Sequence, residues 1–516
     1  MTWVPPQRLL HDSLLAAAAD TPAKPALVAD GRTWSYAELT DAALRFARAL
    51  QDEGIERGDR IAIFMDNTSE CAISIFGTLI AGGVFIVANP QTKADKLAYM
   101  LDDSEAALLA TESTLARVWA PALEHASSTP KLWCVGNRDV DGSDFDLEAV
   151  LAGAEPAPTD LGTIPPDLAA LIYTSGSTGN PKGVMMTHAN MVFAAGSIAE
   201  YLRLSPDDRI MNVLPLAFDY GLYQLLMAIR VGGTLVLERS FAFPAQTLKR
   251  IDEEQVTVFP GVPTVYATLL SMSTRSPHPS VRRVTNTAAA LPPTFHDGLH
   301  ALFPNALIFR MYGLTECKRV SYLEPELVGA KPTSVGKPIP GTEAFVLDEQ
   351  GRRVEPGETG ILYVRGPHVM AGYWRAPELS AEMLKEGPVP GERMLCTHDT
   401  FTIDEEGFLY FVGRTDDIVK TRGEKVSPIE VENALFSIAG VREAAVIGIP
   451  DEVLGEAIRA YVVLENGTTL GEPEIIAACR TKLESFMVPR EVVLLDDLPK
   501  TPTGKIRKKS LLEPVA

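Results

Sequence analysis

The chain has 516 residues, of which 46% are hydrophobic and 22% are charged, and its formal net charge is −20. A chain of this length exceeds what one hydrophobic core organises and predicts at least two domains. The excess of acidic residues argues against nucleic acid or an anionic membrane as a partner, because both would be repelled.

Targeting and redox signals are sparse. The 5 cysteines show no CxxC or Cys/His spacing, so neither a disulfide framework nor a zinc site is indicated. Residues 1–20 carry prolines, a histidine and aspartates where a signal peptide needs an unbroken apolar run. A cytoplasmic protein is expected. Residues 71–88 are uncharged, but Gly82 and Gly83 split them into a buried helix, a turn and a strand rather than a membrane span.

The N-terminal half alternates helices and strands. Ser35 and Glu38 have the spacing of a capping box and open a helix that we expect to end near Gly54. A strand, a helix and a Gly-Gly-led strand occur twice, once in residues 59–87 and once in residues 208–237. Two copies with similar spacing predict two related α/β layers stacked in one large domain.

Residues 171–190 read LIYTSGSTGNPKGVMMTHAN, an apolar strand followed by a loop of glycines and hydroxyl residues. Such a loop suits a polyphosphate, because glycines bring the backbone close while hydroxyls donate hydrogen bonds and Lys182 adds charge. It is not a Walker A loop, because Pro181 precedes the lysine and Gly183 follows it. The segment resembles the phosphate loop of the adenylate-forming superfamily, which contains acyl-CoA synthetases, peptide-synthetase adenylation domains and luciferases. The candidate phosphate-binding residues are Thr174, Ser175, Gly176, Ser177, Thr178, Gly179 and Lys182.

Further segments match the superfamily in the correct order. MYGLTE, residues 311–316, resembles the motif in which Tyr312 would pack on adenine, Thr315 would touch the α-phosphate and Glu316 would hold Mg²⁺. NTAAALP, residues 286–292, lies where the family has a small-residue loop that lines the adenine pocket. This resemblance implies Ala288 and Ala289 as adenine neighbours.

The ribose and lysine motifs follow. By the same resemblance Asp399 and Arg414 would hold the ribose, with His398 in the position where the family has glycine. Histidine tolerates a positive φ better than a β-branched residue does. Lys505, in LPKTPTGKIRKKSL, matches the lysine that bridges the acid and the α-phosphate region, and Lys508 is interpreted as part of a basic tail.

The acid pocket is expected around FDYGLYQLL, residues 218–226. Phe218 matches the aromatic gate of the pocket, and Asp219 follows it. A buried carboxylate needs a partner, and the sequence leaves two interpretations open: a substrate ammonium, or an internal group such as Arg310. The other candidate pocket residues are Tyr220, Tyr223, Phe259, Gly261 and Thr264.

The resemblance implies an α/β enzyme with a large N-terminal domain of stacked layers, a β-rich subdomain and a small mobile α+β C-terminal domain. We expect the domains at residues 1–415 and 416–516, with Asp416 as the hinge and Gly423 in the acceptor channel. In the family, the small domain delivers its lysine for adenylation and then rotates for acyl transfer.

The expected function is an ATP-dependent ligase that forms an acyl-AMP from a small or medium carboxylic acid. The acyl group would pass to the thiol of CoA or of a carrier-protein phosphopantetheine. Three alternatives remain: an amine acceptor, as in coronafacate-ligase-like enzymes; a light-emitting, luciferase-like reaction; and a non-catalytic nucleotide sensor. The nucleotide sensor explains these motifs least well, because a sensor needs no acid-activating lysine. Neither the acid nor the oligomeric state is apparent from the sequence.

Overall fold

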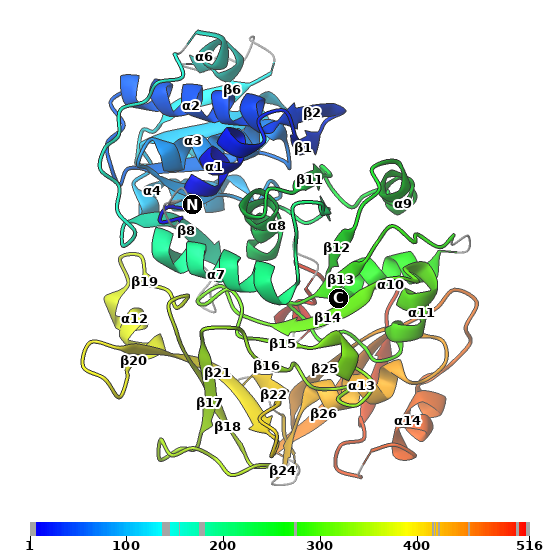
Figure 1. The fold of residues 1–516 in the computed structure, drawn as a ribbon. Coiled ribbons are helices and arrows are strands. Elements are labelled where there is room, and N and C mark those ends of the chain that lie inside the picture. The colour runs from blue at the N-terminus through cyan, green and yellow to red at the C-terminus, as the bar shows by residue number, and fades with distance from the viewer. Residues whose placement is uncertain are drawn as a thin grey trace.

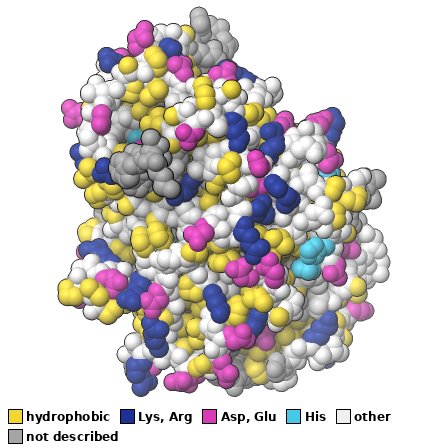
Figure 2. All heavy atoms as spheres, in the orientation of Figure 1, with side chains coloured by type: hydrophobic (Ala, Val, Ile, Leu, Met, Phe, Trp, Pro, Cys, Tyr) yellow, Lys and Arg dark blue, Asp and Glu magenta, His cyan; other side chains and the backbone are white. Residues whose placement is uncertain are grey.

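The computed structural model describes residues 7–136, 145–153, 155–174, 181–272, 276–414, 417, 419–421, 424–451, 455–483, 485–501 and 505–511. Figure 1 shows two layered α/β parts, a β-rich part below them and a small part formed by the end of the chain. Acidic and basic side chains lie interspersed over the face seen in Figure 2.

The first layer is an 8-stranded sheet. Its strands, in spatial order, are β19 (Gly372–Tyr373), β9 (Lys182–Thr187), β8 (Leu168–Thr174), β4 (Val84–Val87), β3 (Arg60–Phe64), β5 (Leu108–Glu112), β6 (Lys131–Val135) and β7 (Phe145–Asp146). The helices of this part are α2 (Tyr36–Asp52), α3 (Ser69–Ile80), α4 (Ala94–Ser104), α5 (Ala116–His125) and α6 (Leu147–Gly153), with a 3₁₀ turn η1 (Ser113–Leu115).

The second layer is a 9-stranded sheet. Its strands, in spatial order, are β16 (Lys337–Pro338), β15 (Ser321–Leu323), β14 (Leu307–Tyr312), β13 (Arg283–Asn286), β12 (Val258–Gly261), β10 (Arg209–Asn212), β11 (Thr234–Leu237), β1 (Pro25–Ala29) and β2 (Arg32–Ser35). Its helices are α1 (Asp12–Asp20), α7 (His188–Tyr201), α8 (Asp219–Arg230), α9 (Pro244–Glu253), α10 (Pro263–Ser271) and α11 (Phe295–Leu302), with a 3₁₀ turn η2 (Pro325–Leu327).

The internal repeat seen in the sequence is a repeat of structure. β3, α3 and β4 form one parallel unit, and β10, α8 and β11 form the other, one in each large sheet. The turn before each second strand uses a left-handed glycine, Gly82 with φ +78° and Gly232 with φ +69°. One hydrophobic cluster joins residues of both sheets and of α3 and α8, so the two layers share a core.

Two local predictions are confirmed. The Ser35 hydroxyl accepts from the Glu38 backbone N–H, the Glu38 carboxylate accepts from the Ser35 N–H, and the helix ends at Asp52. Residues 71–88 divide into α3 without its first two residues, a turn and β4. Within the described part of the chain, no helix is long and apolar enough to cross a membrane.

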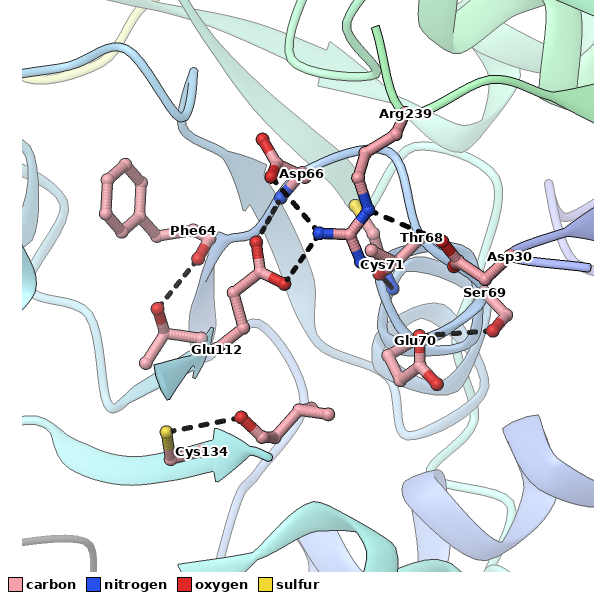
Figure 3. A network of polar contacts seen from close by, with 12 residues as sticks. Asp30, Phe64, Asp66, Thr68, Ser69, Glu70, Cys71, Glu112, Cys134 and Arg239 are labelled. Atoms are coloured by element: carbon pink, nitrogen blue, oxygen red, sulfur yellow. Dashed lines mark hydrogen bonds and ion pairs between the residues drawn. The ribbon is translucent and has the colours of Figure 1, made fainter. Parts of the chain in front are cut away.

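One arginine ties the two layers together at the carboxyl ends of their strands (Figure 3). Arg239, after β11, reaches Asp30 of the β1–β2 turn at 3.4 Å, Asp66 after β3 at 3.4 Å and Glu112 of β5 at 3.7 Å. Glu112 also accepts the Asp66 backbone N–H at 3.1 Å. Because these acids come from both sheets, the guanidinium contacts fix the orientation of one layer against the other.

The β-rich part is a 5-stranded antiparallel sheet. It contains β17 (Glu343–Leu347), β18 (Thr359–Arg365), β21 (Arg393–Ile403), β20 (Leu384–Glu386) and β22 (Leu409–Arg414), with α12 (Pro377–Met383) beside it. Its long strand β21 pairs with β22, which places Asp399 opposite Arg414.

Residues 419–511 form a further 5-stranded sheet with separate hydrophobic clusters. Its elements are β24 (Glu424–Val426), β23 (Val419–Thr421), β26 (Gly455–Leu464), β25 (Val441–Asp451) and β27 (Glu491–Leu494), with α13 (Pro428–Phe436), α14 (Glu472–Arg480) and a 3₁₀ turn η3 (Lys508–Leu511). The predicted mixed α/β architecture is confirmed.

Candidate active site

The proposed phosphate loop is carried by two antiparallel strands. Thr174 ends β8 and is paired with Lys182, which begins β9. The Tyr173 hydroxyl donates to Asp103 at 2.6 Å, which anchors β8 to helix α4. The predicted phosphate ligands Ser175, Gly176, Ser177, Thr178 and Gly179 lie outside the described residues. The described flanks therefore fix where the loop starts and ends.

Lys182 lies beside the predicted metal ligand. Its ammonium is 5.9 Å from the centre of the Tyr373 ring, and the Tyr373 hydroxyl donates to Glu316 Oε1 at 2.6 Å. The backbone carbonyl of Glu316 accepts from Met370 N at 2.8 Å, which holds the loop after β14 in place. Thr315, the predicted α-phosphate contact, precedes Glu316 in this loop. Tyr373 thus connects the start of β9 with the loop that carries Glu316.

Tyr312, Asp399 and Arg414 form a second polar group. The Tyr312 hydroxyl donates to Asp399 Oδ2 at 2.5 Å, and Arg414 Nε lies 3.5 Å from Asp399 Oδ1. Burial raises the pKa of the Tyr312 phenol, and the Asp399 carboxylate raises it further. Asp399 is only 5% exposed, and its Oδ2 is oriented by the Tyr312 hydroxyl while Arg414 supplies a positive charge near Oδ1. The backbone of His398 has φ 55°, which is the positive φ considered for the position where the family has glycine.

The small-residue loop follows β13. Ala288 has φ 74°, a left-handed conformation that is uncommon for a residue with a side chain, and Ala289 is exposed. Left-handed backbone at a non-glycine residue clusters at binding sites and switch regions. The short methyl side chains leave the surface of this loop open for a flat ring.

Lys505 reaches these groups from the C-terminal sheet. Its ammonium lies 6.0 Å from the centre of the Phe218 ring, in the N-terminal half of the chain. Desolvation lowers the pKa of Lys505, Arg414 lowers it further, and the carboxylates of Glu316, Asp399 and Asp219 oppose the shift. Lys505 as a whole residue keeps solvent contact, so the desolvation concerns its ammonium. The Lys505 ammonium therefore lies close both to the wall of the expected acid pocket that contains Phe218 and Tyr220, here called the acid wall, and to the expected nucleotide residues.

Asp219 has an internal partner. Its Oδ1 lies 2.8 Å from the ammonium of Lys318, and the side chains are 9% and 0% exposed. The alternative of Arg310 as this partner is wrong: Arg310 donates instead to the carbonyl of Pro332. Arg310 points to a different neighbour because it lies inside β14, whereas Lys318 belongs to the loop that returns toward α8.

The other predicted pocket residues pack around α8 and β12. Tyr220 donates to the Thr285 carbonyl at 2.7 Å, and Tyr223 is fully buried. A side chain at Gly261 would collide with the Tyr266 ring, since a Cβ there would lie 2.7 Å from it. Phe259 is buried between the rings of Tyr266 and Phe303 and belongs to the core, and Thr264 is half-buried at the start of α10. Phe259 is thus a weaker candidate for lining the acid pocket than Tyr220 and Tyr223.

Three residues of the site were not predicted from sequence: Tyr373, Lys318 and Arg319. Tyr373 lies in the short strand β19, which joins the β8–β9 hairpin only through the fold. Lys318 and Arg319 directly follow the TEC sequence, and a pair of cations after a nucleotide motif was a usable signal. Lys318 has φ 64°, and a Cβ on Gly313 would lie 2.3 Å from the Lys318 carbonyl, so the two backbones touch.

Known families match nearly the whole chain. A family model described as AMP-binding enzyme matches residues 14–374, and a model of the AMP-binding enzyme C-terminal domain matches residues 430–505. The chain belongs to the AMP-binding enzyme family. The predicted membership of the adenylate-forming superfamily and the prediction of an AMP-forming ligase acting on a carboxylic acid are thereby confirmed.

Relatives and solved structures of this AMP-binding enzyme agree. A long-chain-fatty-acid–CoA ligase of Bacillus subtilis is 32% identical over 98% of this chain and 95% of its own length. The structure of a benzoate CoA ligase from Burkholderia xenovorans is 30% identical, with a TM-score of 0.88, and covers 98% of this chain and 100% of its own. The ATP-bound structure of MatB from Rhodopseudomonas palustris is 30% identical, with a TM-score of 0.86, and covers 98% of both chains.

The enzyme has a suitable acid for Mg²⁺. A magnesium ion in nucleotide enzymes is held by one or two carboxylates together with substrate phosphates, so a dedicated cage is not needed. Glu316 Oε1 accepts from the Tyr373 hydroxyl, and Lys182 at the start of β9 lies 5.9 Å from the centre of the Tyr373 ring. Among the described residues no group of three or more potential metal ligands occurs.

Proposed function

We propose that the enzyme adenylates a carboxylic acid with ATP and transfers the acyl group to the thiol of CoA. One observation carries the proposal. The Lys505 ammonium lies over the Phe218 ring, and the negative charges of Glu316 and Asp399 act on it electrostatically. A cation placed between an acid wall and a nucleotide wall is what acid activation requires. A nucleotide sensor has no need of it.

In the first half-reaction, a carboxylate oxygen of the acid attacks the α-phosphorus of ATP. The P–O bond to pyrophosphate breaks, and acyl-AMP forms. Lys505 stabilises the negative charge that gathers at the α-phosphate, and Thr315 donates a hydrogen bond there. Glu316 would hold Mg²⁺, which when bound neutralises phosphate charge.

The remaining residues orient the substrates. We assign Lys182, Thr174 and residues 175–179 to the β- and γ-phosphates, and Ala288, Ala289 and Tyr312 to adenine. Asp399 would accept hydrogen bonds from the ribose hydroxyls, with Arg414 holding that carboxylate. Phe218 closes the acid pocket above Lys505.

In the second half-reaction, the CoA thiol attacks the acyl carbonyl and AMP leaves. We propose that residues 416–516 rotate about Asp416 as a unit, and that Gly423 lines the thiol channel; both residues lie outside the described part of the chain. The relatives that are named as CoA ligases support CoA as the acceptor, and a carrier-protein phosphopantetheine offers the same thiol. We place the enzyme in the cytoplasm, which suits its free and buried cysteines.

The acceptor is tested by product analysis. The enzyme is incubated with ATP, a carboxylic-acid library and either CoA or free amines, and the products are identified by mass spectrometry. Acyl-CoA is expected for every acid that supports pyrophosphate release. Release of an amide with no thioester would overturn the thiol acceptor. In the same assay, Gly423→Leu should let acyl-AMP accumulate while thioester formation falls steeply, because a branched side chain would occupy the channel.

A further inference from the structure

Arg319 is a buried cation without an acid partner in the described part of the chain. It is 3% exposed, and its Nη1 donates to Thr287 Oγ1 at 3.3 Å and to the Lys318 carbonyl at 3.1 Å. Its Nε is buried and has no hydrogen-bond partner among the described residues. A buried guanidinium is normally paired with an anion, so the structure leaves one negative group to be supplied.

The charged residues next to Arg319 do not supply this negative group. The Oδ1 of Asp219, which opens α8, is already matched by the ammonium of Lys318, the residue before Arg319, at 2.8 Å. With one carboxylate and two cations, this corner of the molecule has an excess of one positive charge. A ligand with an additional negative group would balance it.

Arg319 stands at the acid wall. Its guanidinium carbon lies 5.3 Å from the centre of the Tyr220 ring on α8, and Thr287, which accepts from its Nη1, belongs to the small-residue loop and directly precedes Ala288. Burial raises the pKa of Tyr201 to about 12, and the Arg319 charge opposes that rise, so a second buried phenol is close to the guanidinium. Arg319 is therefore held between α8 and the end of β13.

Two cations flank neighbouring aromatic rings of this wall. Lys505 lies 6.0 Å from the Phe218 ring, Phe218 and Tyr220 are 6.3 Å apart in an edge contact, and Arg319 lies over Tyr220. An acid whose reacting carboxylate faces Lys505 would extend along these rings toward Arg319. A second carboxylate on the same molecule would then reach the unpaired guanidinium.

Burial alone does not single out Arg319. Arg310 is 6% exposed, also lacks an acid partner among the described residues, also has a buried Nε without a hydrogen-bond partner there, and donates to the Pro332 carbonyl. What distinguishes Arg319 is its contact with α8 and its place next to the Asp219–Lys318 pair. Arg310 consequently serves as a matched control: the same residue type, equally buried, outside the acid wall.

We propose that the acid substrate is a dicarboxylic acid and that Arg319 binds the carboxylate that does not react. The inference rests on the proposed adenylation of a carboxylic acid and names the class of acid. Arg319 would act through binding geometry and selectivity. The bidentate fork of arginine suits a carboxylate better than the point charge of a lysine.

The test uses the full-length enzyme, ATP, Mg²⁺ and matched pairs of acids. Malonate, succinate, glutarate and adipate are each compared with their monomethyl esters, in which an uncharged methyl ester replaces the second carboxylate, and pyrophosphate release is measured. For at least one pair the diacid should have a kcat/KM at least about tenfold higher, because the ester leaves the guanidinium unpaired. Arg319→Met should bring that diacid-to-ester ratio to about one or below, and Arg319→Lys should give an intermediate ratio. Arg310→Met should not change the ratio.

Several results would overturn the proposal. Preference for the ester at every chain length in the wild-type enzyme would do so even if Arg319→Met fails to fold. A ratio that is the same in the wild type and in a folded Arg319→Met variant would also do so. If ordinary monocarboxylic acids are activated and all diacids are rejected, the adenylation function stands and only this inference falls. If no acid of either kind supports pyrophosphate release, the proposed function itself is wrong and the inference falls with it.

Discussion

The ammonium of Lys318 lies 2.8 Å from the Asp219 carboxylate, and both side chains are buried. Asp219 opens helix α8, and Lys318 lies in the loop that carries Glu316. The ion pair therefore connects the wall of the acid pocket with the loop that we assign to the α-phosphate and the metal. A change in either residue should alter both regions.

Breaking this pair should destabilise the fold. Asp219→Asn leaves a buried ammonium without a counter-charge, and Lys318→Met leaves a buried carboxylate, so each should cost roughly 3–5 kcal/mol. The double variant removes both charges and should be more stable than either single variant. Urea unfolding of the three variants gives the coupling free energy. Additive losses would mean that the two side chains do not depend on each other.

Asp219 should not discriminate between acids that carry an α-amino group and those that lack it. Because its carboxylate is already paired with Lys318, Asp219→Asn should lower kcat/KM for an amino acid and for its desamino analogue by similar factors. The measurement is pyrophosphate release with matched acids. A loss confined to the amino acid, by several kcal/mol in transition-state binding, would instead assign Asp219 to a substrate ammonium.

Lys505→Ala should separate the two half-reactions. Removing the cation should slow acyl-AMP formation by about a hundredfold or more, because charge stabilisation of the transition state is lost. Transfer from supplied acyl-AMP to CoA should be largely retained. Lys508→Ala is the matched control: this lysine lies in the same terminal segment but pairs with Glu432 at 2.7 Å. Equal losses in both half-reactions of Lys505→Ala would contradict domain alternation.

The alkaline side of the adenylation pH profile should depend on Arg414. Lys505 acts in its charged form, so the rate should fall as pH rises through its pKa. Desolvation and Arg414 lower that pKa, and this moves the fall to a lower pH than for a free lysine. Arg414→Gln should shift the fall upward. A profile whose alkaline limb is the same in both enzymes would show that another group titrates there.

Buried histidines should make the fold sensitive to mild acid. Burial lowers the pKa of His188 and of His368 to about 4, and both side chains are fully buried. The unfolded chain takes up these protons near the ordinary histidine pKa of about 6.5, so the free energy of unfolding should decrease as pH falls from there toward 4. Protonation of each histidine should lower the free energy of unfolding by roughly 3 kcal/mol as the pH falls through this window.

The check is urea unfolding at a series of pH values. In His188→Asn, an amide oxygen can replace Nδ1 as acceptor for the Leu10 N–H, which now donates at 3.1 Å, and the residue no longer titrates. The slope of stability against pH should be smaller in this variant. An unchanged slope would remove His188 from the acid response.

Much of the fold could be predicted from the sequence because its signals are local. The capping box at Ser35, the glycine turns at Gly82 and Gly232 and the alternation of apolar runs depend on residues a few positions apart. The nucleotide motifs were similarly accessible, since Tyr312, Glu316, Asp399 and Lys505 each stand in a short characteristic segment. The order of these segments identified the superfamily.

The partners of the site residues were decided by the tertiary structure. Asp219 and Lys318 are separated in the sequence by the strands β11, β12, β13 and β14, and an ion pair between such positions depends on the path of the chain. Nothing near Tyr373 in sequence indicates that its hydroxyl meets Glu316, because the short strand β19 must first join β9. The sequence shows which side chains have groups capable of catalysis or binding. Which of them are already paired, and which, like Arg319, are left to bind a substrate, follows only from how the layers pack.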